Sequence, residues 1–361
     1  MKMRKIVCSF MISVVCFMTA ISGVSATSYD TSKINAAYSK VVEYYKNNNN
    51  LNNADKILAV ESLGLEAESN QFDTSSADLS STSLSKKIVT EVLLGVDPTE
   101  DKETLESQID ENGNVEGSWG ASSDVWTLYA LYVTSSEKTN LIANKLNDEL
   151  AASSVCGYEW GGTYYADYDT TGWVIEGLAV VNKEKYATTI NKAIDYIKNN
   201  TTMTTTGWVT ADNVDTQSQV LEGMFAYDAN ALLNDSYTVH PVDCLLNTQL
   251  SDGSFPSGYN AEYTTAEVAK TLGTYKNGSV IIKAKKAYDK MMNPEQPDNT
   301  KPAQPTDTKK DSQSTNKVET TNKKTTSVKT GDETNVVIFA SLSMVSGGLF
   351  LVLRKEYERA H

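Results

Sequence analysis

Histidine and cysteine are both scarce in this chain, whose 361 residues include two histidines and four cysteines. A catalytic zinc ion is held by three protein ligands, drawn mostly from histidine, cysteine and carboxylates. The two histidines, His240 and His361, stand far apart in the sequence, so they do not form the pair around which such a site is usually built. We therefore expect no catalytic zinc site, no other metal site and no cofactor.

Cysteine is also too rare for a fold that depends on disulfide bonds. Cys8 and Cys16 lie in the apolar leader described below, which leaves Cys156 and Cys244 in the body of the protein. These two are able to form one disulfide outside the cell, whereas isolated cysteines are often simply buried as free thiols. The sequence leaves both interpretations open.

Positive charge is in short supply. The whole chain has 32 Lys and Arg against 46 Asp and Glu, and residues 27–293 alone have 19 against 37, a net charge of about −18. Nucleic-acid affinity comes mostly from neutralising phosphates with basic side chains. An acidic body of this kind argues against a nucleic-acid partner.

Long apolar runs are confined to the two ends of the chain. Residues 1–26 begin with three basic residues, continue with an apolar run and end at the small residue Ala26, which is typical of a secretory signal cleaved after that residue. Residues 336–353 form an uncharged apolar run of 18 residues with basic residues after it. Such a run is just long enough to cross a bilayer as a transmembrane helix, with its basic flank in the cytoplasm. We therefore expect the part between the two ends to face the outside of the cell.

Composition divides the rest into a globular body, residues 27–292, and a linker, residues 293–330. The linker is rich in Pro, Thr, Ser and Lys and has almost no large apolar residues. It buries too little apolar surface to offset the entropy of ordering, so we expect a disordered, extended tether. Residues 331–361 then form the C-terminal anchor.

The body contains an internal repeat. Residues 113–131, 157–179, 207–226 and 249–273 each have a turn with glycine and one aromatic residue, followed by a helix-like run. Aligned positions in the four copies are 47, 46 and 48 residues apart, a period that fits a loop plus two helices. The aromatic residues of the four turns are Trp119, Trp160, Trp208 and Phe255.

Two kinds of helix alternate along this repeat. One kind has a single apolar stripe with spacings of three and four, as expected for an outer helix, and the other is rich in Gly, Ala and Thr, as expected for a helix packed on several sides. The predicted outer helices are residues 34–46, 137–150, 183–199 and 242–250. The predicted inner helices are residues 54–64, 81–95, 122–133, 169–181, 215–226 and 263–273.

These patterns predict an all-α fold, since no convincing strand pattern is present. Tandem helix pairs form either an open superhelix or a closed ring. Because six inner helices suffice for closure, we expect an α/α toroid, a barrel of helical hairpins.

The last repeat resembles a known family. Gln249, Gly253 and Phe255, with Thr265 and Leu272 after them, are similar to the prenyltransferase and squalene-oxidase repeat of the α/α toroid superfamily. The resemblance implies that the glutamine bonds to the neighbouring helix and that the aromatic ring stacks there, so that each turn acts as a staple. It covers about residues 30–290 and concerns the fold more than the function.

The enzymatic and thioester branches of that superfamily have motifs that this chain lacks. The stretch Asp212 to Asp215 is without the adjacent carboxyl pair of the terpene cyclases, and Asp243 and Cys244 do not have the spacing of the prenyltransferase zinc ligands. The residues around Cys156 do not match the thioester motif. Corrinoid carriage, which another branch performs, stays open by analogy of fold alone.

The C-terminus resembles a cell-wall sorting signal of Gram-positive bacteria. Lys329, Thr330, Gly331 and Asp332 are followed by the apolar run and the basic tail, and the resemblance implies cleavage between Thr330 and Gly331. Ser327-Val328 stands where the commonest form has Leu-Pro. The alternative is a simple stop-transfer helix, so the protein is expected on the outer face of the cell, attached to the wall or to the membrane.

Several acidic residues recur at the period of the repeat. Asp169 and Asp215, with Asp124 nearby in another copy, are expected to cap helices, as is Thr264 in the last copy. Glu176 and Glu222 match one another, and together with Asp169 they are candidate catalytic acids of an enzyme such as a polysaccharide lyase or hydrolase or a terpenoid cyclase. A feature that recurs at the repeat period is more often structural, so a non-catalytic protein is favoured.

An aromatic cluster is the most unusual local feature of the sequence. It either lines a ligand site or consists of hairpin staples with half-buried tyrosines. The sequence therefore predicts a surface-anchored extracellular binding module for a glycan, an apolar small molecule or a protein, with a catalytic toroid as the alternative. The candidate ligand-binding residues are Tyr158, Trp160, Tyr164, Tyr165, Tyr168 and Trp173.

Overall fold

The computed structural model describes residues 28–68, 74, 80–201, 213–257 and 260–293. The predicted signal, the linker beyond residue 293, the anchor with Thr330 and Gly331, and the ring of Trp208 lie outside these residues. In the part of the chain that is described, no helix is long and apolar enough to cross a membrane.

The described chain is mostly helical, which confirms the predicted all-α class. One antiparallel hairpin interrupts the helices, and it consists of β1 (Gly157–Trp160) and β2 (Thr163–Ala166). The hairpin was not predicted, because its alternation is only four residues long in each strand. The helices are α1 (Ser32–Asn47), α2 (Ala54–Ser62), α3 (Ser81–Leu93), α4 (Thr99–Ser107), α5 (Ala121–Val133), α6 (Thr139–Ser153), α7 (Tyr168–Asn200), α8 (Val214–Asn234), α9 (Pro241–Leu246), α10 (Ala261–Asn277) and α11 (Val280–Met292).

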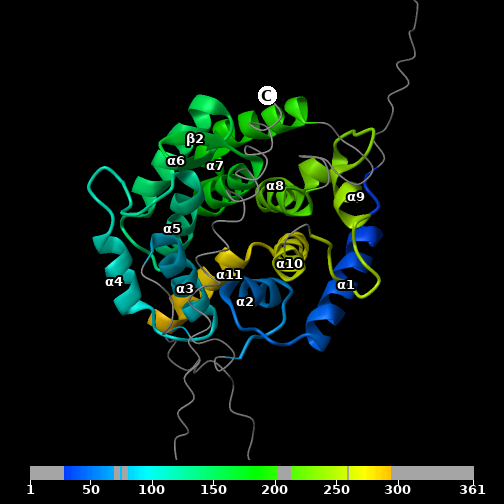
Figure 1. The fold of residues 1–361 in the computed structure, drawn as a ribbon, viewed down its shortest axis with the longest axis horizontal. Coiled ribbons are helices and arrows are strands. Elements are labelled where there is room, and N and C mark those ends of the chain that lie inside the picture. Colours follow the sequence, from blue (N-terminus) through cyan, green and yellow to red (C-terminus); the bar gives the residue numbers. More distant parts are fainter. Residues whose placement is uncertain (1–27, 69–73, 75–79, 202–212, 258–259, 294–361) are drawn as a thin grey trace, which may run out of the picture.

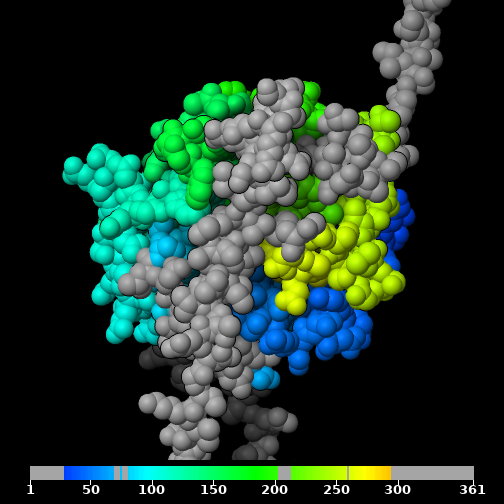
Figure 2. Space-filling model, in the orientation of Figure 1, coloured from blue at the N-terminus to red at the C-terminus, as the bar shows by residue number. Residues whose placement is uncertain are grey.

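Each of the six predicted inner segments is helical in the structure. They are α2, α3, α5, the first part of α7, the first part of α8 and α10. Each packs against the next in this order, and α10 packs against α2, so the six helices follow one another around a closed circle (Figure 1). Figure 2 shows the first helix, α1 in blue, beside α10 in yellow.

Helices α7 and α8 each combine an inner and an outer segment without a loop. The backbone leaves helical angles at Asn182 in α7 and at Asp228 in α8. Each of these side chains accepts a hydrogen bond at 3.0 Å from the backbone N–H three residues later, as an N-cap does. The predicted outer helix 183–199 is therefore the second part of α7.

Small residues allow neighbouring inner helices to touch. A Cβ atom added at Gly172 of α7 would lie 2.4 Å from the carbonyl oxygen of Gln219 in α8, and one added at Gly223 would lie 2.3 Å from the carbonyl oxygen of Gly172. No larger side chain fits at such a contact. This close approach explains why the inner segments are rich in glycine and alanine.

The predicted caps of α7 and α8 are wrong, because both helices begin earlier than the pattern indicates. The caps are Asp167 and Asn213, whose side chains accept hydrogen bonds at 2.7 and 3.3 Å from the backbone N–H three residues on. Asp169 and Asp215 lie in the first turn instead. They still face the positive end of the helix dipole, but they do not close the helix end.

Helices α5 and α10 also begin before the residues proposed as their caps. Asn260 caps α10, four residues ahead of Thr264. Asp124 lies inside α5, fully buried, where it accepts a hydrogen bond from Ser118 at 2.6 Å and pairs with Lys145 at 2.8 Å. Asp124 therefore ties α5 to its own loop and to α6.

The structure contains no disulfide between the two cysteines of the body. Cys156 and Cys244 are both buried free thiols. Cys156 precedes the hairpin, beside α5 and α7, whereas Cys244 lies in α9, which packs on α1 and α8. Burial raises the pKa of both thiols, to about 11 for Cys244, so neither is a reactive thiolate at neutral pH.

Two helices have no counterpart in the prediction. Helix α4 completes the outer layer beside α3, and α11 crosses one end of the circle, in contact with α2, α3, α5 and α10. Because α11 follows α10, it covers the end at which the inner helices finish. The hairpin precedes α7, so it lies at the end at which the inner helices begin.

Candidate ligand-binding surface

The hairpin has a tight turn that its sequence requires. Gly161 and Gly162 have φ values of +58° and +77°, and two successive residues with positive φ form the type I′ turn that suits a two-residue hairpin. Tyr158 pairs with Tyr165, and Trp160 pairs with Thr163. Because side chains alternate along a strand, these four share one face of the hairpin.

Three aromatic rings of that face are joined by a fourth from another loop. The rings of Tyr158 and Tyr165 are stacked, with centroids 5.5 Å apart. Trp119, which precedes α5, meets Trp160 edge to face at 5.4 Å, and its carbonyl oxygen accepts a 2.7 Å hydrogen bond from the N–H of Glu159. We call Trp119, Tyr158, Trp160 and Tyr165 the aromatic ledge.

The tryptophans of the aromatic ledge are open to solvent. The exposed fraction is 40% for Trp119 and 44% for Trp160. Large apolar side chains normally leave water when a chain folds, and a contiguous exposed group of them often marks a binding surface. The buried staple role that the resemblance implies for the aromatic residues of the turns is therefore not observed at Trp119 and Trp160.

The structure separates the six predicted ligand-binding residues. Three of them, Tyr158, Trp160 and Tyr165, belong to the aromatic ledge. Tyr164 projects from the opposite face of the hairpin, where its hydroxyl donates to Glu149 of α6 at 3.0 Å.

The other two predicted residues lie on α7. Trp173 is half-buried, with its ring 6.0 Å from that of Trp126 on α5. Tyr168, in the first turn, is also half-buried. Neither belongs to the face that carries the ledge.

The true counterpart of Phe255 in this part of the repeat is Cys156. The N–H of Phe255 donates to the hydroxyl of Thr265 at 3.0 Å, and the N–H of Cys156 donates to the hydroxyl of Thr171 at 2.9 Å. The two threonines lie seven residues before the aligned positions 178 and 272. Cys156 therefore fills the buried staple position, and the hairpin is an insertion after it.

One repeat earlier, the buried turn position is again occupied by a non-aromatic residue. Gly113 and Gly253 both have positive φ, and each donates its N–H to the carbonyl oxygen three residues before it. Counting from these glycines places Val115 opposite Phe255, and Val115 is buried. In both copies a tryptophan lies four residues after the buried residue. This shared spacing would have identified Trp119 as a candidate, but it is not visible when the repeats are aligned on their aromatic residues.

Two carboxylates lie beside the aromatic ledge. Asp167 directly follows β2, and Asp169 is in the first turn of α7. Burial is the largest cause that raises the pKa of the Tyr158 hydroxyl, and the negative charges of Asp167 and Asp169 raise it further. Burial raises the pKa of Asp167 to about 6, and burial with the nearby charges of Asp167 and Asp215 raises that of Asp169 to about 7.

The candidate catalytic acids Glu176 and Glu222 lie in a cluster within the circle of inner helices. Glu176 accepts hydrogen bonds from Tyr129 at 3.0 Å and from Ser279 at 2.6 Å. Glu222 accepts from Thr274 at 3.3 Å. Burial raises the pKa of both, and the charge of Glu176 raises that of Glu222 further. Both side chains are at most 3% exposed, which favours a packing role over contact with a polymer.

One lysine balances part of this acid cluster. Lys270 of α10, itself 3% exposed, lies 3.0 Å from Glu267 and 3.9 Å from Glu222. A buried ion pair of this kind contributes little net stability, but it costs several kcal/mol to break. The cluster therefore fixes the relative positions of α7, α8 and α10.

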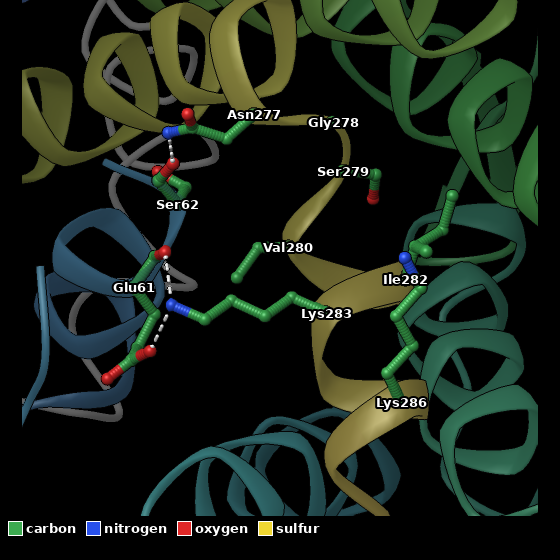
Figure 3. A pocket seen from close by; sticks show the side chains of 9 residues that line it. All are labelled: Glu61, Ser62, Asn277, Gly278, Ser279, Val280, Ile282, Lys283 and Lys286. Carbon is green, nitrogen blue, oxygen red and sulfur yellow. Dashed lines mark hydrogen bonds and ion pairs between the residues drawn. The ribbon is translucent and has the colours of Figure 1, made fainter. Parts of the chain in front are cut away.

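A pocket of about 210 Å³ lies beneath α11, at the end opposite the aromatic ledge. Figure 3 shows Lys283 crossing it to Glu61, with the ion pair at 2.6 Å, and Asn277 donating to the carbonyl oxygen of Ser62 at 2.8 Å. Ser279, on its wall, is the residue that donates to Glu176. These polar groups are already paired with one another, so the pocket is a gap under α11 with few groups left for a ligand.

The described residues contain no group of three or more His, Cys, Asp or Glu side chains that is arranged to hold a metal ion. His240 caps α9 by accepting the N–H of Val242 at 3.2 Å. Its ring lies between Tyr29 and Tyr237, at 4.3 and 5.0 Å. This histidine therefore has a structural role.

Comparison with family models, with curated proteins and with solved structures finds no match to this chain.

Proposed function

We propose that this protein is an extracellular, non-catalytic binding module that holds a glycan on the aromatic ledge. In this proposal the closed circle of helices is an α/α toroid of the prenyltransferase and squalene-oxidase repeat type. The module is exported by residues 1–26 and held at the surface of a Gram-positive cell by the tether and the sorting signal. The ledge, at the end of the ring away from α11, is then presented to the surroundings.

The observation that carries this proposal is the position of Trp119 and Trp160. Two neighbouring repeats fill their buried turn position with a small residue and place a tryptophan in solvent four residues later. The two exposed rings then meet at 5.4 Å. A fold that needed these rings for stability would bury them, as it buries Phe255.

The shape of the ledge favours a sugar over the other two ligand classes. An apolar small molecule is usually enclosed in a concave pocket, whereas the ledge is an open surface. A stable protein interface buries about 1,200–2,000 Å² in total, but the large exposed apolar side chains outside the hairpin, such as Leu250 and Met292, lie in other elements, and Tyr164 of the hairpin projects from its opposite face. Rings with an apolar face and a polar edge suit a sugar, which has both.

Titration of the full chain with β-1,4-linked hexasaccharides, followed by tryptophan fluorescence and calorimetry, tests the proposal. We expect saturable binding that weakens about tenfold or more, or about 1.4 kcal/mol, in Trp119→Ala and in Trp160→Ala. Tyr196→Ala removes another exposed aromatic ring, on the outer part of α7, and is the control, with unchanged binding. Binding that survives both tryptophan changes, or no binding to any hexasaccharide, contradicts the proposal.

A further inference from the structure

We propose that the aromatic ledge selects glycans that carry free ammonium groups, such as β-1,4-linked glucosamine, because Asp167 and Asp169 lie beside its rings and no lysine or arginine of the described residues pairs with them. This selectivity rests on the proposed function, since it requires that sugar rings stack on the ledge. It adds the chemical class of the ligand.

Asp167 projects on the same side of the hairpin as the ledge. Its backbone is extended, with φ −143° and ψ 157°, and its N–H donates to the carbonyl oxygen of Cys156 at 2.9 Å, which continues the ladder beyond the last strand pair. Tyr165 and Asp167 are two residues apart along this extended chain, so their side chains point the same way. Glu159 and Tyr164 point the other way.

Asp169 follows two residues after Asp167, in the first turn of α7, and α7 packs against β1, the strand that carries Tyr158. The charge of Asp169, like that of Asp167, acts on the hydroxyl of Tyr158. Asp169 accepts a hydrogen bond from Thr216 of α8 and thereby lies between α7 and α8 at the end of the ring that carries the hairpin. A ligand stacked on Tyr158 is therefore within electrostatic reach of two acids.

These acids differ from Asp55 and Glu267, which lie on inner helices, because they have no cation beside them. Asp55 pairs with Lys86 at 2.9 Å, and Glu267 pairs with Lys270 at 3.0 Å. No ion pair to Asp167 or Asp169 is present among the described residues. Asp167 accepts hydrogen bonds from the N–H and the hydroxyl of Thr170 at 2.7 and 3.0 Å, and the charges that act on Asp169 are acidic. The groups that face Asp169 are Asp167, Tyr158, Thr216, Asp215 and Glu267.

An ammonium group on a sugar ring would supply the missing charge. It would pair with Asp167 or Asp169, and it also interacts favourably with the face of a tyrosine ring. Burial raises the pKa of Asp167 to about 6, and burial together with the charges of Asp167, Asp215 and Glu267 raises that of Asp169 to about 7. A bound cation would lower both pKa values.

The test compares two probes with the same linkage and ring count. The full chain is titrated with a hexamer of β-1,4-linked glucosamine and with its fully N-acetylated form at pH 7 and low salt. We expect the glucosamine hexamer to bind about tenfold more tightly or better, by about 1.4 kcal/mol. The preference should fall to less than about threefold in Asp169→Asn and in Asp167→Asn.

The variants are chosen so that folding does not hide the answer. Asparagine at position 167 still caps a helix, and thermal melts establish that each variant is folded. Glu159→Gln, on the opposite face of the hairpin, is the matched control and should keep the full preference. Hexalysine, a cation without sugar rings, should bind at least tenfold more weakly than the glucosamine hexamer.

Each failure has its own pattern. Equal affinity for the two hexamers overturns the selectivity and leaves glycan binding in place. A preference that persists in both Asp variants, or is lost equally in Glu159→Gln, overturns the assignment to Asp167 and Asp169. Hexalysine that binds as tightly as the glucosamine hexamer shows simple charge attraction and also overturns the inference. Loss of all binding to both hexamers contradicts the proposed function itself.

Discussion

The turn around Phe255 and the hairpin after Cys156 occupy the same position in two repeats, and they use their aromatic residues in opposite ways. In both, the buried residue donates its N–H to a threonine on the following inner helix. Phe255 fills that position with a ring that is fully buried. Cys156 fills it with a small side chain, and the aromatic residues of this repeat lie in the inserted hairpin instead.

The two turns differ in how firmly their aromatic residues are packed against the rest of the fold. The first turn is tied down on all sides: Gln249 donates to the carbonyl oxygens of Ala37 on α1 and of Gly253, at 3.0 and 3.1 Å. The hairpin keeps the threonine contact but places its tryptophan in water. A repeat that retains its anchor while it exposes an aromatic residue has gained a surface that the fold does not need.

The largest effect is expected from Phe255→Ala. Removing a fully buried ring leaves a cavity and typically costs about 3–5 kcal/mol of unfolding free energy. Chemical denaturation followed by far-UV circular dichroism measures the loss, and Phe255→Leu should cost less than about 1.5 kcal/mol. The affinity for the glycan should not change in the folded variant. A cost for Phe255→Ala below about 1 kcal/mol would mean that the ring is not a staple.

A smaller and nearly equal effect is expected at the two threonines. Thr171→Val and Thr265→Val each leave a buried N–H without its acceptor, which costs about 1–3 kcal/mol. Equilibrium unfolding of both variants tests whether the two positions are equivalent, and Thr163→Val, exposed on the hairpin, serves as the control. Costs that differ by more than about 1.5 kcal/mol would argue against the shared position.

The sequence predicts the helices well because the periodicity of apolar residues reports on burial directly. The six inner segments and the outer segments 34–46, 137–150 and 183–199 agree with helical residues in the structure to within a few positions. Helix ends were predicted less well, since Asp169 and Asp215 resemble caps as much as Asp167 and Asn213 do. Only the backbone angles, extended at the true cap, distinguish them.

The candidate site was predicted only in part, because alignment on aromatic residues gives the wrong register. Trp160 and Phe255 are both aromatic and align with each other by residue type, yet the buried position is occupied by Cys156 in one copy and by Val115 in another. The contact between Trp119 and Trp160 joins residues 41 positions apart, and nothing local to either residue indicates it. The crossing of α11 over the end of the ring likewise depends on tertiary packing.

A pH-dependent effect on stability is expected at Asp169. In contrast to the ring of Phe255, which stabilises the fold, the buried charge of Asp169 destabilises it. The unfolded chain loses this proton near pH 4, about the usual value of 3.9, whereas the folded chain keeps it to about pH 7. The folded state therefore binds more protons in that interval, and its stability falls as the pH rises from about 4 to about 7. Asp169→Asn removes that fall.

Thermal unfolding at a series of pH values tests this prediction. Relative to the parent chain, Asp169→Asn should gain melting temperature as the pH rises and should show no gain at pH 4. Glu159→Gln, on the solvent side of the hairpin, should show no such trend. A gain in melting temperature that is the same at all pH values would mean that the effect comes from packing and that ionisation of Asp169 does not destabilise the fold.

The smallest effect on stability is expected where the effect on binding is largest. Trp119→Ala and Trp160→Ala remove rings that are 40% and 44% exposed, and surface substitutions of this kind usually change the unfolding free energy by no more than about 0.5 kcal/mol. Denaturation curves of the two variants should therefore nearly overlay that of the parent chain, while the glycan affinity falls. If either change costs as much as Phe255→Ala, the tryptophans serve the architecture after all, and the contrast between the two turns disappears. A near-zero cost together with lost binding is the combination that only a functional surface produces, because a structural residue cannot be removed without cost to the fold.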